Sequence, residues 1–271
     1  MAPAAERRCP ADRWPQGREH VLITNSGPEV PAGPGAAAPA TRGVRKAAVL
    51  FDVDGTLVDS TYLHTMAWWQ AFRQAGYDVP MASIHRSVGM GGDRILAKLL
   101  PAGRDTDADS AIMTSHAAVF STFWPALRPL DGARELLAQC HDGGLAVALA
   151  SSARERDLEV LRATIGADAF IDAATSSADA KESKPAPDIL VAALAAVRVP
   201  PAAAVYVGDA VWDIYAAGKL GIPAIGLTCG GTSEAELLDA GAVETYPSPR
   251  ALLENLRDSA IGQLAAGVRP S

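Results

Sequence analysis

An apolar run near residue 50 ends in two acidic residues that are one position apart. The stretch is VLFDVDGTLVDS (49–60), and its acids are Asp52 and Asp54. One interpretation is a hairpin turn, because Asp-Gly after an apolar strand is a common turn sequence. The other is a pair of carboxylates at the end of a buried strand, placed to hold a metal ion or to act on a phosphate group. The rest of the chain must decide between them.

Polar residues also follow other apolar runs of the chain. Ser151 and Ser152 follow LAVALA (145–150), Asp209 follows AAVYVG (203–208), Asp213 lies four residues after Asp209, and Lys184 lies in ESKPAPD, just before an expected helix. Each of these residues has an ordinary interpretation when taken alone. The serines and Asp209 could cap helices, and Asp213 and Lys184 could lie in solvent.

Taken together, these residue types suit phosphoryl transfer. A carboxylate nucleophile and a phosphate dianion repel each other by roughly 4 kcal/mol per charge pair, at about 4 Å and an effective dielectric constant of about 20. Mg²⁺ and a lysine ammonium can offset this repulsion. Asp52 and Asp209 offer the hard oxygen ligands that Mg²⁺ prefers, and a serine hydroxyl suits phosphate oxygens.

The elements that must position these residues begin at Arg45. We expect strands over 46–51, 145–150, 169–175, 203–208, 223–228 and 243–246. We expect helices between them over 133–144, 155–166, 187–197, 211–221, 232–241 and 249–256. Apolar strands that alternate with helices predict an α/β fold with a parallel sheet covered on both faces. Ligands of such sheets lie outside the carboxyl ends of the strands, so we expect the polar residues to share one edge.

A helical block separates the first strand from the second. Its first helix is expected over 60–76, with Ser60 or Thr61 as the cap at its start and Gly76 at its end. One face of this helix carries the apolar side chains of Tyr62, Met66, Trp69 and Phe72. Further helices are expected over 94–100 and 108–124, and a glycine-rich joint, VGMGGD (88–93), precedes them.

The composition argues against several kinds of partner. The net charge of −7 disfavours a nucleic-acid or anionic-membrane surface, and no apolar run is long enough to span a membrane. Cys9, Cys140 and Cys229 fit no metal-binding spacing, so we expect a reducing, cytoplasmic compartment. Residues 1–44 are rich in Pro, Gly and Ala without periodicity, and we expect a disordered tail there.

Other phosphate and metal motifs fail in this chain. An EF-hand that ended its acidic run at Gly55 would need an acid at Leu50 and a Glu at Thr61. No GxxxxGK[ST] loop or GxSxG elbow occurs, and GMGGDR (89–94) has Arg94 where the third glycine of GxGxxG belongs.

The ordered set of motifs resembles a known family. FDVDGTLVDS, the serine after LAVALA, the lysine of ESKPAPDI and VGDAVWD resemble the four signature motifs of the haloacid dehalogenase-like superfamily, in that family's order. The resemblance spans roughly residues 46–257. It implies a Rossmann-like parallel-sheet core over 45–62 and 130–260, with an inserted small α-helical cap over 63–129. Such a cap is similar to that of the phosphoglycolate phosphatase and β-phosphoglucomutase group.

The resemblance also implies roles for the motif residues. Asp52 would be the nucleophile that forms an aspartyl-phosphate, and Asp54 would protonate the leaving alcohol and then deprotonate the attacking water. Ser151, Ser152 and Lys184 would hold the phosphoryl group, and Mg²⁺ would be bound by Asp52, Asp54 through its backbone carbonyl, Asp209 and Asp213. Because an acid stands at position 54, phosphate-ester chemistry is favoured over carbon–halogen cleavage.

Three functions remain open at this point. The first is a Mg²⁺-dependent phosphatase for a small phosphorylated metabolite, such as a sugar phosphate or a phosphoglycolate-like compound. The second is a β-phosphoglucomutase-like phosphomutase, although Gly92 stands where that enzyme has a basic cap residue. The third is a non-catalytic protein that binds phosphorylated metabolites. In each case we expect a monomer or a homodimer.

The cap is expected to choose the substrate. Arg86, Gly91 and Gly92 are the candidate specificity residues, with Arg94 as an alternative cation. A surface ion pair is the competing interpretation for the two arginines. His64, His85 and His116 are interpreted as structural or exposed residues.

Overall fold

Six short apolar segments form one parallel sheet in the computed structural model, which describes residues 45–268. The strands are β1 (Ala48–Phe51), β2 (Ala146–Ala150), β3 (Ala173–Thr175), β4 (Ala204–Gly208), β5 (Ala224–Leu227) and β6 (Glu244–Tyr246). Their order across the sheet is β3-β2-β1-β4-β5-β6. Phe51 lies opposite both Leu149 and Val207, so β1, β2 and β4 end at the same level. The residues that follow these three strands therefore meet at one edge.

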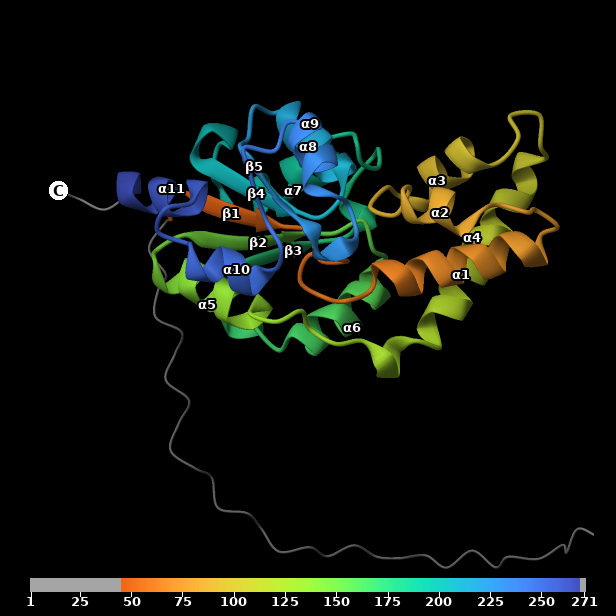
Figure 1. Cartoon of the computed structure of the whole chain (residues 1–271), viewed down its shortest axis with the longest axis horizontal. Helices are drawn as coiled ribbons and strands as arrows, with labels where there is room; N and C mark the ends of the chain where they lie inside the picture. Colours follow the sequence, from red (N-terminus) through yellow and green to blue (C-terminus); the bar gives the residue numbers. More distant parts are fainter. Residues whose placement is uncertain (1–44, 269–271) are drawn as a thin grey trace, which may run out of the picture. The chain divides into compact units, whose positions relative to one another are not determined.

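Helices cover both faces of this sheet (Figure 1). One face is covered by α5 (Ala133–Asp142), α6 (Glu155–Ile165), α10 (Pro249–Glu254) and α11 (Ala260–Val268), and the other by α7 (Asp188–Val197), α8 (Val211–Gly218) and α9 (Glu234–Asp239). Side chains of β1 alternate between the faces: Val49 and Phe51 join the first core cluster, and Leu50 joins the second. The predicted α/β fold with a two-sided parallel sheet is confirmed.

Four helices lie between β1 and α5, in the segment that the sequence predicts to be an inserted cap. They are α1 (Thr61–Gln74), α2 (Met81–His85), α3 (Gly92–Leu99) and α4 (Asp109–Ser121). The cap has an apolar cluster of its own, which includes Trp68, Phe72, Ile84, Leu96 and Ile112. The division into a cap over 63–129 and a core over 45–62 and 130–260 stays a prediction.

The buried face of α1 only partly matches the one that the apolar pattern suggested: Phe72 is fully buried, but the other three predicted residues are not. Tyr62, Met66 and Trp69 are 56%, 46% and 38% exposed, whereas Trp68 is 4% exposed. The reason is the partner helix: Trp68 stacks on His116 of α4, with 4.0 Å between the ring centroids. A shift of one residue along a helix turns the face by about 100°, and both faces of α1 carry apolar side chains.

Two other expectations differ from the structure. The strand expected over 169–175 is confined to β3, because residues 168–170 form a 3-10 turn. The chain also continues past the last expected helix into α11, where Ile261 is buried in the core. The tail expected over residues 1–44 lies outside the described residues. Within 45–268, no helix combines the length and apolar character needed to cross a membrane.

Candidate active site

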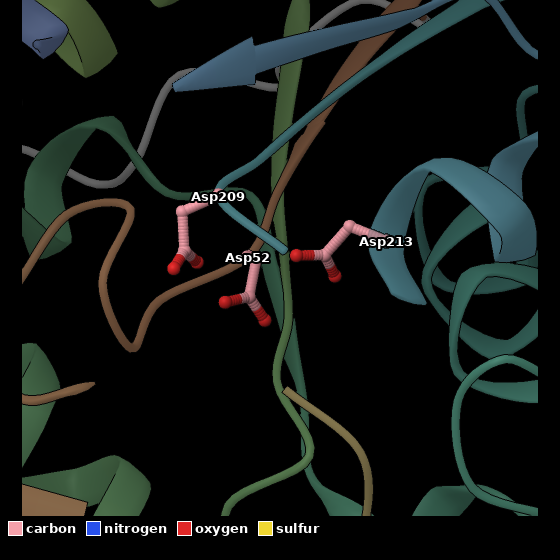
Figure 2. A group of neighbouring side chains, drawn as sticks. All are labelled: Asp52, Asp209 and Asp213. Atoms are coloured by element: carbon pink, nitrogen blue, oxygen red, sulfur yellow. The ribbon is translucent and has the colours of Figure 1, made fainter. Parts of the chain in front are cut away.

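Three aspartates converge at the edge of the sheet where β1 and β4 end (Figure 2). Asp52 follows β1, Asp209 follows β4, and Asp213 reaches toward them from the first turn of α8. One carboxylate oxygen of each lies within 4.8 Å of the others. The backbone N–H of Asp52 donates to the Val207 carbonyl at 2.9 Å, which continues the β1–β4 pairing to the acid itself.

Lys184 lies fully buried among these acids. Its Nζ is 2.6 Å from Asp52 Oδ1 and 2.8 Å from Asp213 Oδ1. Burial disfavours the ammonium, but the carboxylates of Asp213 and Asp52 outweigh it and raise the pKa of Lys184 above its ordinary value. The lysine is therefore charged at neutral pH, and the interpretation as a surface lysine is wrong.

Asp213 is held by the core as well as by the lysine. It is 0% exposed, so it does not lie on a solvent-facing turn. The Tyr206 hydroxyl donates to its Oδ1 at 2.8 Å, and the Ala210 N–H donates to its Oδ2 at 3.1 Å. Asp213 thus fixes both Lys184 and the start of α8.

The carboxylate of Asp209 lies in a slot between two glycines. A Cβ at Gly230 would lie 1.7 Å from Asp209 Oδ2, and a Cβ at Gly55 would lie 2.4 Å from it. The Thr56 hydroxyl donates to Asp209 Oδ1 at 3.1 Å. Gly55 also has a φ of +81°, a conformation that other residues rarely adopt. Any larger residue at either glycine would displace the carboxylate.

Asp54 lies on the cap side of this group and has its own partners. Its Oδ1 accepts a hydrogen bond from the Ser60 hydroxyl at 2.6 Å and lies 3.1 Å from His64 Nε2. Ser60 precedes α1 as expected, but its side chain makes no cap bond and binds Asp54 instead. Burial favours the neutral acid, but His64 and then Ser60 outweigh it, so the pKa of Asp54 is lowered.

The two serines follow β2, the neighbour of β1 on its other side. Ser151 is completely buried, and its Oγ accepts a hydrogen bond from the Ala153 N–H at 3.0 Å. Ser152 is partly exposed. The helix-cap interpretation fails, because α6 begins after Arg154 rather than after a serine. Both serines remain candidates for phosphate binding.

Comparison with known proteins identifies the family of this chain. A family model described as haloacid dehalogenase-like hydrolase matches residues 46–221. The chain belongs to the haloacid dehalogenase-like hydrolases. It is 31% identical over 191 residues to validoxylamine A 7'-phosphate phosphatase of Streptomyces hygroscopicus subsp. limoneus, which covers 70% of this chain and 88% of the relative.

Two further hydrolase relatives cover most of the described chain. The phosphoglycolate phosphatase of Pseudomonas putida is 26% identical over 230 residues, 82% of this chain and 84% of the relative. A solved structure of a hydrolase from Pseudomonas syringae superposes with a TM-score of 0.75 at 29% identity, and covers 79% of this chain and 98% of that one.

The acids of this hydrolase carry more negative charge than Lys184 can balance. Burial, together with the charges of Asp213 and Asp54, raises the pKa of Asp52 to about 7 against the opposing effect of Lys184. Burial, together with the charges of Asp213 and Asp52, raises the pKa of Asp209 well above its usual value. A divalent cation with a preference for oxygen ligands would relieve this excess.

A buried hydroxyl without a partner also faces this group. Thr61 is 4% exposed, and its Oγ1 has no hydrogen-bond partner within residues 45–268. A Cβ added at Gly55 would lie 2.2 Å from Thr61 Oγ1 and 2.4 Å from Asp209 Oδ2, so the hydroxyl and the carboxylate lie on either side of the same small space. A hydrated cation would supply a water for this hydroxyl. The donor set and the orphan hydroxyl therefore fit Mg²⁺.

The raised pKa of Asp52 predicts how pH changes the stability of the metal-free protein. Between the ordinary value of 3.8 and about 7, the folded state binds a proton that the unfolded state has released. The free energy of unfolding should therefore fall as pH rises from 5 to about 7. Urea unfolding of the parent and of Asp52→Asn checks this. The parent should lose stability relative to the variant by at least about 1 kcal/mol, and parallel pH profiles would contradict the expectation.

His64 is the residue that the sequence interpretation missed. Its side chain is 12% exposed and stacks on Phe120 at 3.7 Å between centroids. Its Nδ1 lies 3.2 Å from His116 Nε2, and burial lowers the pKa of His116 well below its usual value. An ionised carboxylate only accepts hydrogen bonds, so His64 Nε2 donates to Asp54 Oδ1. The available signal was the position of His64 in the first turn of the helix that follows the Asp54 loop.

Loss of the His64 bond should be felt most by substrates with poor leaving groups. His64→Phe keeps the ring against Phe120 but removes the donor to Asp54. We expect kcat/KM for an alkyl phosphate to fall by about 10²-fold, the ordinary size of general-acid catalysis. The value for p-nitrophenyl phosphate should fall far less, because its leaving group needs no proton. His64→Gln, which keeps a donor, is the control, and equal losses for both substrates would contradict a role in proton supply.

The cap candidates divide into two groups. The Arg86 side chain is 67% exposed and pairs with Glu236, so it does not lie with the acids. Gly91 lies beside the loop that carries Lys184, because a Cβ at Gly91 would lie 2.0 Å from the Oγ of Ser183. Gly92 instead faces Trp68, at 3.2 Å from its ring. The alternative cation, Arg94, forms a 2.7 Å ion pair with Glu182.

Proposed function

We propose that this chain is a Mg²⁺-dependent phosphatase that hydrolyses a small phosphorylated metabolite through an aspartyl-phosphate. The observation that carries the proposal is the buried carboxylate of Asp52, held by the Lys184 ammonium and next to two further acids. Buried titratable groups with specific charge partners are typical of functional sites, where nucleophiles are found. The phosphatases among the relatives support the same reaction.

In the first step, an Asp52 carboxylate oxygen attacks phosphorus and the bond from phosphorus to the ester oxygen breaks. The Asp54–His64 pair supplies a proton to the departing oxygen, so the alcohol leaves neutral. Lys184 holds Asp52 Oδ1 and brings positive charge next to the phosphoryl group. Ser151 and Ser152 are proposed to donate to the phosphoryl oxygens from the end of β2.

In the second step, water attacks the aspartyl-phosphate. Asp54 accepts a proton from this water, the bond between phosphorus and Asp52 breaks, and inorganic phosphate is released. Asp52, Asp209, Asp213 and the Asp54 carbonyl are the proposed surroundings of Mg²⁺, which supplies positive charge to the phosphoryl oxygens when it is bound. The resting carboxylate of Asp52 is thus regenerated.

The test is a panel of phosphorylated metabolites with release of inorganic phosphate as the readout, with Mg²⁺ and then with EDTA. We expect Mg²⁺-dependent release from at least one sugar phosphate or phosphoglycolate-like compound. Transfer of the phosphoryl group to a second sugar phosphate, with little free phosphate, would identify a phosphomutase. A protein that binds such compounds and turns none over would be the non-catalytic alternative.

The joint at 88–93 gives a test of cap specificity. Gly91→Ala should lower kcat/KM by about tenfold or more for every substrate, because its Cβ would push on Ser183 and shift the adjacent Lys184. The atoms nearest to a Cβ at Gly92 belong to Trp68 and Met113 of the predicted cap. Gly92→Ala should lower kcat/KM for the natural metabolite far more than for p-nitrophenyl phosphate. Equal losses in Gly92→Ala would show that the joint does not select the substrate.

The proposal includes the setting of the enzyme. Cys140 and Cys229 are both free, as suits a reducing, cytoplasmic compartment. The enzyme is proposed to be a monomer or a homodimer, with its core over 45–62 and 130–260 and its cap over 63–129.

A further inference from the structure

Cap helix α2 contacts the core at the loop 228–231, which follows β5. His85 Nε2 lies 3.0 Å from the carbonyl oxygen of Gly230. Because a carbonyl oxygen only accepts, His85 Nε2 carries a proton and donates it. The His85 ring also stacks on Tyr62, with 4.7 Å between centroids. Both rings press on Gly231, where a Cβ would lie 2.7 Å from the Tyr62 hydroxyl and 2.8 Å from His85 Nε2.

The same loop forms one wall of the slot that holds Asp209. Gly230 is the wall itself, since its Cβ position would lie 1.7 Å from Asp209 Oδ2. The opposite wall is Gly55, and the Cys229 thiol joins the two walls by donating to the Gly55 carbonyl at 3.2 Å. A shift of Gly230 would therefore change the space available to the Asp209 carboxylate.

Beside the contact of Tyr62 and His85 with Gly231, the space beneath α2 is open. A cavity of about 470 Å³ lies between α1 and α2 on one side and the core on the other. Contacts that cross at its edge include the His85 bond and the exposed ion pair between Arg86 and Glu236. Of these two contacts, the His85 hydrogen bond is the one made to Gly230, the residue that packs against Asp209.

We propose that His85 is a positioning residue for the metal site. Its hydrogen bond holds Gly230 against Asp209. The position of α2 therefore affects the position of the Asp209 carboxylate, a proposed Mg²⁺ ligand. The inference rests on the proposed Mg²⁺-dependent function. Because coupling between two binding events is reciprocal, a bound Mg²⁺ would favour the docked cap by the same factor by which the docked cap favours Mg²⁺.

The test is the affinity for Mg²⁺ alone, measured by titration calorimetry on the full-length, metal-free protein. His85→Phe keeps the stack on Tyr62 and removes the donor, and we expect its Kd to rise by about fivefold. His85→Gln keeps a donor and should stay within about twofold of the parent. Glu236→Gln is the matched control: it weakens the neighbouring cap–core ion pair, leaves Gly230 alone, and should also stay within about twofold.

A second readout separates positioning from general damage. At saturating Mg²⁺, His85→Phe should recover the parent kcat for p-nitrophenyl phosphate, while the Mg²⁺ concentration for half-maximal activity rises. Parent-like Mg²⁺ affinity in His85→Phe overturns the inference, and so does an equal loss in Glu236→Gln. A parent that neither binds Mg²⁺ nor releases phosphate overturns the proposed function instead.

Discussion

Asp52→Asn is expected to lose at least about 10⁴-fold in kcat for p-nitrophenyl phosphate, the scale on which removal of a nucleophile acts. An amide oxygen is a weak nucleophile and a poorer partner for both Lys184 and a cation. The loss should occur in a folded protein, because the substitution removes an acid whose pKa is raised by burial. Steady-state kinetics at saturating Mg²⁺, with circular dichroism on the same sample, gives the measurement.

The same motif contains a matched control. Asp59 follows in the DVDGTLVDS run but is exposed to solvent, so Asp59→Asn should keep nearly the parent rate. Mass spectrometry of the parent, quenched during turnover, should place a phosphoryl group on Asp52. Substantial turnover by purified Asp52→Asn would remove Asp52 from its assigned role.

Lys184→Met is expected to damage both stability and catalysis. The substitution leaves Asp52 and Asp213 buried without the ammonium that lies 2.6 and 2.8 Å from them. Breaking a buried ion pair from one side costs about 3–5 kcal/mol of unfolding free energy. Loss of a positive group at the phosphoryl site should lower kcat by about 10²–10³-fold as well.

The pH dependence identifies the cause of the instability. Lys184 opposes the rise in the pKa of Asp52, so without it that pKa rises further and the folded state takes up a proton as pH falls. The stability deficit of Lys184→Met should therefore be larger at pH 8 than at pH 5. Urea unfolding at both pH values measures it, and the exposed Lys181 of the same loop gives the control Lys181→Met. A deficit that does not change with pH would point to lost packing instead of unpaired charge.

The location of the site was determined by the sequence alone. Continuous apolar strands must be buried on both faces, which requires a parallel sheet, and parallel strands in register end at one edge. The acids after β1 and β4 and the serines after β2 had to meet there for that reason. The Asp-Gly pair at 54–55 also indicated a turn, and Gly55 has the positive φ that such a turn requires.

The partners of these residues depended on contacts between distant segments. Lys184 does not follow a strand directly and is 132 residues from Asp52 in the chain. The fold of the loop before α7 brings it to the acids. Arg86 looked like a substrate cation but pairs with Glu236, because α9 of the core lies within its reach. Local sequence carries no information about such encounters, since each depends on where two rigid elements dock.

The cap illustrates the same division within one helix. Periodicity predicted α1, and Gly76 marked its end, but two neighbouring faces of the helix were both apolar enough to be buried. Packing of Trp68 on His116 of α4 selected one face and turned Trp69 to solvent. That choice of face is also what aims His64 at Asp54. The helix period shows which residues share a face, but the neighbouring helix decides which face is buried. For that reason only the tertiary structure identified His64 as the partner of Asp54.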